Sequence, residues 1–345
     1  AAQPDDHADR LFQSDGTAGG TTALAAPCAA LESGQITRLH ANPAHAFYEV
    51  RCGFDEPALW ASDGRAAGTG SLLAAGEFRR TTPFYAAPQW VDEGNRALFL
   101  QGGSYSSPLE LWATDGTAAG TFRLGVLTQQ TGATGALARR ANGDYLILVW
   151  EHFAALSVWR SDGTVAGTVL AAPIDLGSPS FSVRAFAATS DGIYCLIDGG
   201  AVGARQLWYS DGTVAETRWL GDFEAGVWAG LVAHDGAVFF AAEAFGGAGI
   251  WRSDGTVATT RRIVELASVA VSADSFAFLD DRIYWLGFAW SGVSGALYGA
   301  PIAGGAAEEL LQTCIGSYCS PLFDGYWLRT VGESLVFSRF EGGAA

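Results

Sequence analysis

Aromatic and acidic side chains gather in the longest segments between the predicted strands of this chain. An exposed aromatic ring can stack on a sugar or an apolar side chain, and a neighbouring carboxylate can accept hydrogen bonds from hydroxyl or amide groups. The candidate binding residues are Tyr85, Tyr105, Glu151, His152, Phe153, Asp198, Glu243, Phe245 and Trp290. The alternative interpretation is that several of these rings cap the apolar core.

Evidence for catalysis in the sequence is thin. Glycoside hydrolysis needs two carboxylates ~5–9.5 Å apart, and nothing in the sequence selects such a pair. Gly-x-Ser-x-Gly, Cys-x-x-Cys and His-Glu-x-x-His motifs do not occur, and Arg79 with Arg80 is the only cationic cluster in these segments. His40 and His234 end predicted strands, but solvated turn residues are a simpler interpretation than a metal site. We expect no cofactor and no metal.

A repeated motif must position all of these residues. It reads aromatic residue, spacer, Ser or Thr, Asp, Gly and Thr, and it returns at intervals of 43 to 52 residues. Asp-Gly favours a two-residue hairpin turn, and the aspartate can accept hydrogen bonds from amides two residues on. The turn aspartates are Asp15, Asp63, Asp115, Asp162, Asp211 and Asp254. A Ca²⁺ site would need six to eight oxygens at one centre, so we predict structural turns instead.

The aromatic residue of the motif recurs once per repeat at a fixed strand position. Its copies are Phe12, Trp60, Trp112, Trp159, Trp208, Trp251 and, in a weaker seventh repeat with Gly-Gly in place of the turn, Tyr298. A set of sugar-stacking rings is one interpretation. Regular spacing favours packing between successive repeats, and we therefore assign these rings to the core.

Each repeat contains about four predicted strands, and the second strand is apolar at nearly every position. Residues 145–150 and 193–197 show this pattern. A strand that is apolar on both faces must be covered on both faces, as in a blade packed between two other blades. The turns between first and second and between third and fourth strands are short, while the opposite rim carries the long connections. We expect ligand or partner contacts on this long-loop rim.

Repeats of roughly 40 to 50 residues with four strands each are typical of β-propellers. We predict an all-β fold, a single seven-bladed β-propeller of four-stranded antiparallel blades over residues 1–345, with residues 1–10 as a loose N-terminal lead-in. Residues 11–24 supply an outer pair of strands and residues 326–340 an inner pair. Pairing these two halves would complete the seventh blade and close the ring.

The repeat resembles that of bacterial secreted proteins with tandem E-L-W-x-S/T-D-G-T-x-x-G-T repeats, which are assigned to β-propellers. The resemblance covers nearly the whole chain and is specific for fold. It implies little about activity, because such repeats occur in proteins of mixed role. The contiguous Ser-Asp-Gly differs from the Ser-x-Asp-x-Gly of sialidase-like propellers, so no sialidase residue is carried over.

Composition excludes several classes of partner. The formal net charge is −16, and all twenty basic residues are arginine. Nucleic acid and anionic membrane surfaces select basic patches, so neither is an expected partner. The absence of lysine excludes Schiff-base chemistry. No apolar run approaches the ~18 residues of a membrane span, so membrane insertion is not expected.

Five cysteines are consistent with an oxidising compartment. We predict disulfides Cys28–Cys52 and Cys314–Cys319, with Cys195 buried and free. Five reduced core cysteines are the alternative. The first residues have no methionine and fit a mature form after removal of a signal peptide, although an arbitrary boundary would look the same. We expect a protein that is secreted, periplasmic or on the cell surface of a bacterium.

These observations favour an extracellular non-catalytic binding or assembly module. It would recognise a protein or glycan partner outside the cell through the long-loop rim, or serve as a subunit of a larger surface assembly. The alternative is a propeller hydrolase or lyase that acts on a carbohydrate at the channel mouth.

Overall fold

A computed structural model gives the structure of the chain. It describes residues 7–25, 27–28, 33–53, 55–81, 88–103, 107–151, 155–177, 181–199, 205–224, 230–244, 247–266, 269–271, 276–289, 294–315 and 328–337. The chain divides into two compact units. The first unit is Ala1–Arg139, Gly143–His152 and Ser157–Leu170; the second is Arg140–Asn142, Phe153–Leu156 and Ala171–Ala345.

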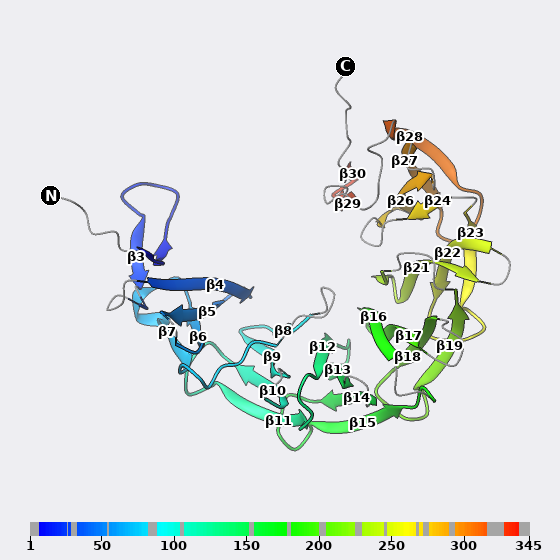
Figure 1. The fold of residues 1–345 in the computed structure, drawn as a ribbon. Helices are drawn as coiled ribbons and strands as arrows, with labels where there is room; N and C mark the ends of the chain where they lie inside the picture. Colours follow the sequence, from blue (N-terminus) through cyan, green and yellow to red (C-terminus); the bar gives the residue numbers. More distant parts are fainter. Residues whose placement is uncertain are drawn as a thin grey trace. The chain divides into compact units, whose positions relative to one another are not determined.

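The described residues form β-strands and one short 3-10 helix, η1 (Ala66–Gly68), so the fold is all-β as predicted. Within the described ranges, no helix is long and apolar enough to cross a bilayer. Three blades begin in the first unit, each with its strands antiparallel and in chain order (Figure 1). Blade 1 is β4 (Ser33–Ala41), β5 (Ala46–Cys52), β6 (Ala58–Ser62) and β7 (Thr69–Leu73); blade 2 is β8 (Trp90–Glu93), β9 (Arg96–Gly102), β10 (Leu109–Thr114) and β11 (Phe122–Thr128); blade 3 is β12 (Thr134–Arg139), β13 (Tyr145–Glu151), β14 (Ala155–Ser161) and β15 (Val169–Ile174).

Three further blades belong to the second unit. Blade 4 is β16 (Phe181–Ala188), β17 (Ile193–Gly199), β18 (Arg205–Ser210) and β19 (Arg218–Phe223); blade 5 is β20 (Val232–His234), β21 (Ala237–Ala244), β22 (Gly247–Ser253) and β23 (Arg261–Glu265). Blade 6 has two short strands, β24 (Val269–Val271) and β25 (Ala277–Leu279), in the first position, followed by β26 (Arg282–Ala289), β27 (Ser294–Pro301) and β28 (Glu308–Ile315).

Two smaller sheets supply the halves of the predicted seventh blade. The first is β2 (Leu11–Gln13) with β3 (Thr22–Ala25), and the second is β29 (Leu328–Val331) with β30 (Ser334–Phe337). The fold is therefore that of a β-propeller, with six blades formed by consecutive strands and two two-stranded half-sheets near the ends of the sequence. Each half forms its own sheet, so pairing of the two halves stays a prediction.

The motif turns are longer than the predicted two-residue hairpins. In blade 1 the register pairs Ser62 with Thr69, so residues 63–68 form the turn. The Ser62 and Thr69 hydroxyls lie 2.7 Å apart and close it, and the Asp63 carboxylate accepts a hydrogen bond of 2.8 Å from the Arg65 amide. The other five motif turns each have a hydroxyl pair at 2.7 or 2.8 Å across the same positions.

A two-residue turn fails here because type I′ needs positive φ at both central residues and type II′ needs it at the first, which is the aspartate. Only the glycine of each motif has one, for example Gly64 at φ 84° and Gly116 at φ 86°, whereas the aspartates do not. The aspartate side chain instead organises a wider loop. True two-residue turns with a left-handed aspartate occur elsewhere, between first and second strands, where Asp235 has φ 46° before Gly236.

A second glycine of the motif is required by contact with the aspartate. In four repeats the aspartate carboxyl lies directly over this glycine; a Cβ added at Gly120, for example, would sit 2.1 Å from an Asp115 oxygen. The fifth and sixth repeats carry Glu216 and Thr259 at this position. The Thr259 hydroxyl bonds to Asp254, so this repeat replaces close packing with a hydrogen bond.

A β-bulge accompanies the motif aromatic. The register between third and fourth strands shifts immediately before Trp60, Trp112, Trp208 and Trp251, and the same shift precedes Phe12. A bulge re-aims the side chain that follows it. This device fixes the direction of each ring.

Second strands form the centre of the core, as their sequences predict. In β13 the six residues from Tyr145 to Trp150 are all buried, and β9 and β17 are nearly as enclosed. Apolar clusters join blade 1 to blade 2, blade 2 to blade 3, blade 4 to blade 5 and blade 5 to blade 6. Each fully buried large apolar side chain in such a cluster contributes about 1.5–3 kcal/mol.

The motif aromatics pack between blades, but they are half-buried rather than part of the core. Trp112, Trp159, Trp251 and Tyr298 each lie against the cluster that their blade shares with the preceding one. Phe12, in the half-sheet β2–β3, is 59% exposed. Phe12 is this exposed because the sheet that carries it has only two strands, β2 and β3.

The N-terminal lead-in is more ordered than predicted. β1 (His7–Ala8) pairs with β4 in parallel, at His7 with Ser33 and Ala8 with Gly34. The Asp9 carboxylate then accepts a hydrogen bond of 2.9 Å from the Ile36 amide. The inner edge of blade 1 is thus covered at its start by residues 7–9.

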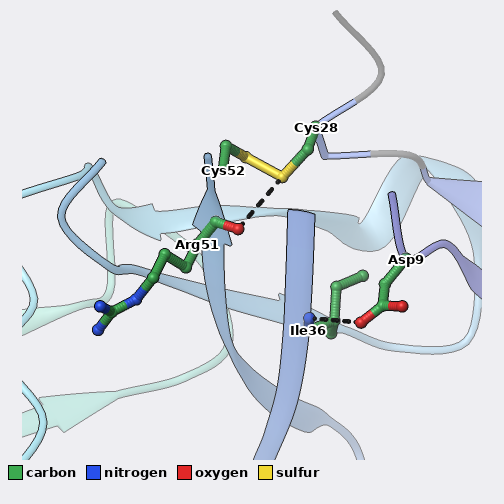
Figure 2. The surroundings of a disulfide bond; sticks show 5 residues. All are labelled: Asp9, Cys28, Ile36, Arg51 and Cys52. Carbon is green, nitrogen blue, oxygen red and sulfur yellow. Dashed lines mark hydrogen bonds between the residues drawn. A yellow bond between two sulfur atoms is a disulfide. The ribbon is translucent and has the colours of Figure 1, made fainter. Parts of the chain in front are cut away.

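The predicted disulfide between Cys28 and Cys52 is present (Figure 2). Cys28 is buried, and its sulfur lies close to the Arg51 carbonyl oxygen at 3.7 Å. Cys195 is free and buried, and burial raises the pKa of its thiol to about 12. The predicted partner of Cys314 is Cys319, which lies outside the described residues, and this bond stays a prediction.

The motif aspartates predict a pH-dependent stability. Hydrogen bonds from Thr117, the side chain first, lower the pKa of Asp115 below its ordinary value. A depressed pKa contributes stability that is present above the unfolded value of ~4 and is lost as pH falls through the folded value. We expect Asp115→Asn to lower stability by about 0.5 kcal/mol at pH 6, because this side chain is mostly exposed, and by less below pH 4.

Urea midpoints of wild type, Asp115→Asn and the control Asp281→Asn, compared at pH 6 and pH 3, measure this effect. A difference between wild type and Asp115→Asn that stays constant over this range would show that carboxylate charge has no part in the turn.

Close packing of the disulfide predicts that Gly34 tolerates no side chain. A Cβ added at Gly34 would lie 2.6 Å from both Cβ and Sγ of Cys28. We expect Gly34→Ala to cost about 1–3 kcal/mol in the oxidised protein, as overpacking does. In a Cys28→Ser/Cys52→Ser background the cost should fall, as thermal melts would show. An equal cost in both backgrounds would locate the strain elsewhere.

Ring closure predicts unequal effects of two N-terminal truncations. Deleting residues 1–25 removes β1 and the half-sheet β2–β3, whereas deleting residues 1–6 leaves every described strand in place. If β2–β3 covers the open edge of β30, the longer deletion should lower the melting temperature far more, because an unpaired edge and its apolar face become exposed. Removing β1 alone, by deleting residues 1–9, separates its contribution. Equal melting temperatures for deletions 1–9 and 1–25 would mean that β2–β3 closes nothing.

Candidate functional site

The structure describes three of the nine candidate binding residues in part or in full. Glu151 ends β13 and is half-buried, Asp198 lies in β17, and the backbone of Glu243 lies in β21. The remaining candidates lie outside the described residues: Tyr85, Tyr105, His152, Phe153, Phe245 and Trp290. Their grouping on the long-loop rim stays a prediction.

Asp198 is held by two arginines from neighbouring strands. The Arg205 Nε donates a hydrogen bond of 2.7 Å to one carboxylate oxygen, and the Arg184 Nε donates to the other. Arg184 sits at a β-bulge in β16, where the register shifts between Val183 and Ala185. Two charge-assisted bonds satisfy this carboxylate, so the geometry indicates a structural role in blade 4.

Other rim carboxylates are also engaged. Glu77 accepts a hydrogen bond of 2.9 Å from the Ala74 amide, and Glu56 lies 3.6 Å from the Arg79 guanidinium. The Asp222 carboxylate accepts a hydrogen bond of 3.0 Å from the Trp219 indole N–H. The Glu77 and Asp222 contacts are local in sequence, whereas the Glu56–Arg79 pair joins the β5–β6 connection of blade 1 to the segment that bonds to β9 of blade 2.

The two histidines considered for a metal each stack on a ring of the next blade. His40 Nε2 lies 2.7 Å from Asp92 Oδ1, and the His40 ring stacks on Trp90 with centroids 5.3 Å apart. His234 stacks on Phe278 at 4.0 Å. Among the described residues, no group of three potential metal ligands occurs. Both histidines therefore act as bridges between first strands.

First strands are irregular in blades 1 and 2. A bulge in β4 falls between Arg38 and His40. In blade 2 the first-strand position is shared: the Gly102 amide bonds to the Arg79 carbonyl oxygen at 2.7 Å, Arg80 bridges to Gln101, and β8 begins only at Trp90. In a propeller blade the first strand is the innermost, so these irregularities fall on the innermost strands of blades 1 and 2.

A cavity of about 380 Å³ lies between these two first strands. Its polar and charged lining consists of Arg38, His40, Arg80, Thr81 and Gln89, and its apolar lining of Leu39, Phe78, Pro88, Trp90 and Leu100. The volume is at the lower end of the ~300–1,000 Å³ usual for ligand sites, and the lining is half polar and half apolar, which is more polar than most such sites.

The polar groups of this cavity are arranged by the strands around it. His40 is fixed by Asp92 and by the Trp90 ring, which stacks in turn on Phe99 with centroids 4.4 Å apart. The Gln89 side-chain amide nitrogen donates a hydrogen bond of 2.7 Å to the Gly135 carbonyl oxygen. Thr81 is 3% exposed, and its hydroxyl has no hydrogen-bond partner among the described residues. We take this cavity as the candidate functional site.

A second cavity, of about 550 Å³, lies between blades 5 and 6. It is lined by Glu265, Leu266, Trp285, Tyr298 and residues 305–307, where the seventh repeat lacks the Ser-Asp-Gly turn. Glu265 is its only charged lining residue, so convergent polar chemistry is weaker here than between blades 1 and 2.

The sequence missed most of the candidate site. Arg38, Thr81, Gln89 and Trp90 carry no motif, and only Arg80 and His40 were noted, for other reasons. One signal was readable: the segment from the end of β7 to β8 is unusually long for the repeat, which indicates an insertion at the start of blade 2. The bulge in β4 leaves no trace in the sequence.

No protein-family model matches the chain, and no curated protein matches it either. Among solved structures, oligopeptidase B from Leishmania major is similar over 92% of this chain and 46% of its own, with 11% identity and a TM-score of 0.50. A structure of prolyl endopeptidases covers 88% of this chain and 46% of its own, with 11% identity and a TM-score of 0.49. The β-propeller domain of the Trilobed protease from Pyrococcus furiosus covers 88% and 90%, with 10% identity and a TM-score of 0.43.

At these identities the similarity shows the fold alone. The chain spans about half the length of the first two peptidases. The expectation of a non-catalytic binding or assembly module is corrected by the match to oligopeptidase B, which is an enzyme and is similar over 92% of this chain. The alternative drawn from the sequence is a propeller hydrolase or lyase that acts on a carbohydrate at the channel mouth. Its hydrolase part is better supported than the binding module, and none of these matches supports its carbohydrate substrate.

Proposed function

We propose that this chain is the propeller of a peptide hydrolase and that its substrate meets the first strands of blades 1 and 2. The observation that carries the proposal is the fold shared over 92% of the chain with oligopeptidase B, whose name marks it as a hydrolase of peptides. The cavity between β4 and β8 supports it, because this cavity combines an apolar wall with fixed donors at the innermost strands.

In this proposal the hydrolytic groups belong to a separate catalytic domain. Three of the rim carboxylates already have local partners: Asp198 accepts from two arginines, Asp222 from an indole and Glu77 from a backbone amide. The matched oligopeptidase is about twice as long as its matched part, so a peptidase of this kind has room for a catalytic domain beside its propeller. The propeller would hold or admit the peptide, and the catalytic domain would cleave it.

An oxidising compartment fits this function. The Cys28–Cys52 bond is typical of exported proteins. The repeat also resembles that of secreted bacterial proteins. The disulfide and this resemblance together support a peptidase that works outside the cytoplasm of a bacterium.

The test is to purify the native protein from its source with an antibody against this chain and to assay it for hydrolysis. Labelled oligopeptides and aryl glycosides are the two substrate arms, and material captured with pre-immune serum is the control. We expect cleavage of peptides and none of glycosides. Native protein that cleaves neither would overturn the proposal, and cleavage of glycosides alone would overturn its substrate class.

A further inference from the structure

We propose that the cavity between blades 1 and 2 is a carboxylate site, built to take a carboxylate on an apolar stem. Under the proposed function this group is the C-terminal carboxylate of a peptide, and only that last assignment rests on the proposed function. Two guanidinium groups, Arg38 and Arg80, line the cavity, and none of its lining residues is acidic. In a chain of net charge −16 a cavity with this lining stands out from the average surface.

Both arginines retain charge for a ligand. Arg38 is exposed and has no ion-pair partner among the described residues. Arg80 lies 3.8 Å from Glu49, which is beyond hydrogen-bond distance, and its side chain is half exposed, so its guanidinium N–H groups can still donate to a ligand. Glu49 also lies 3.5 Å from Arg51, which shares its charge. A guanidinium matches a carboxylate in shape and can donate two parallel hydrogen bonds to it.

The acidic groups near the cavity face other partners. Asp92 points its Oδ1 at His40 Nε2, 2.7 Å away, so its charge is engaged by a lining residue rather than aimed at the ligand space. The Glu49 side chain is 12% exposed and lies between two arginines. Neither carboxylate lines the cavity, so an incoming anion would meet donors first.

Thr81 provides an independent sign of a ligand. Thr81 lines the cavity and is 3% exposed, and its buried hydroxyl has no hydrogen-bond partner among the described residues. A buried unpaired hydroxyl costs about 1–3 kcal/mol, so such a group usually marks a role. A carboxylate oxygen in the cavity would accept its proton in a hydrogen bond. The site then has three donors: two guanidiniums and one hydroxyl.

The apolar wall decides against a bare inorganic anion. Phe78 and Leu100 are only 2% and 3% exposed, but Leu39 and Trp90 are half-buried and Pro88 is exposed. Inorganic phosphate or sulfate would leave these last three side chains in contact with water. A carboxylate with a hydrocarbon or aromatic stem would cover them, at about 25 cal/mol per Å² of apolar surface removed from water. The combination therefore selects an amphipathic acid.

Binding to the full chain tests the proposal. The probes are N-acetyl-alanyl-phenylalanine, its C-terminal amide and inorganic phosphate, each titrated by calorimetry. We expect the acid to bind at least tenfold more tightly than the amide or phosphate, because one charge-assisted hydrogen bond is worth about a factor of ten. Equal affinities for acid and amide would overturn the carboxylate assignment, and equal affinities for acid and phosphate would overturn the role of the apolar wall.

Variants locate the site. Arg38→Gln and Arg80→Gln should each weaken binding of the acid about tenfold or more, whereas Arg65→Gln, which makes the same charge change in an exposed turn of blade 1, should leave it unchanged. Unchanged affinity in both cavity variants would overturn the proposal. Melting temperatures of all three variants confirm that each is folded before titration.

Thr81→Val separates a ligand-binding hydroxyl from one that is merely buried. Removing an unpaired buried hydroxyl while keeping its shape should raise the melting temperature of the free protein, and it should weaken binding of the acid at the same time. A higher melting temperature with full affinity would remove Thr81 from the site. These outcomes concern binding by the chain itself, so they stand or fall separately from hydrolysis by the native protein.

Discussion

The structure depends on second strands that are apolar on both faces. A strand such as β13, buried from Tyr145 to Trp150, cannot be stable in a sheet that is wet on one side. Each blade therefore needs another blade on either side, and the clusters that join blade 1 to blade 2 and blade 5 to blade 6 show how this need is met. Repetition of the motif follows from the same constraint, because every blade must offer its neighbours a similar surface.

The motif turn solves a smaller problem within each blade. The aspartate, the flanking hydroxyl pair and the left-handed glycine build a loop that needs no contact outside its own repeat. Local construction explains why these turns could be located from the sequence, and why their length could not. Asp-Gly predicts a tight turn. The longer turn observed here depends on the hydrogen bond between the Ser62 and Thr69 hydroxyls, and these two residues are too far apart in the sequence for a dipeptide pattern to include both.

The candidate site shows where prediction from sequence ends. The strand pattern, the disulfide between Cys28 and Cys52 and the buried thiol of Cys195 follow from periodicity and residue type, since these properties are local or nearly so. Asp198, chosen as a ligand residue, is instead bound by Arg184, which a bulge turns toward it. Arg38, Arg80 and Thr81 converge through another bulge and an interrupted first strand. Such irregularities depend on packing between blades, and hydrophobic periodicity along the sequence does not reveal them.

The same irregularities make chemistry available in a fold that otherwise conceals it. A regular first strand pairs its backbone and alternates its side chains, so it offers few convergent groups. The bulge at Arg38 and the divided first strand of blade 2 bring donors and apolar side chains together at a single cavity. The chain as a whole is strongly negative, so a cavity lined by two arginines and no acidic residue is a local site of positive charge. Beyond a Debye length of about 8–10 Å the field of distant carboxylates is screened, so an anion within the cavity responds mainly to the two guanidiniums beside it. An anion that lacks an apolar part gains only that local attraction, whereas an amphipathic acid also gains from the wall, and the difference between the two is the specificity that this cavity can supply.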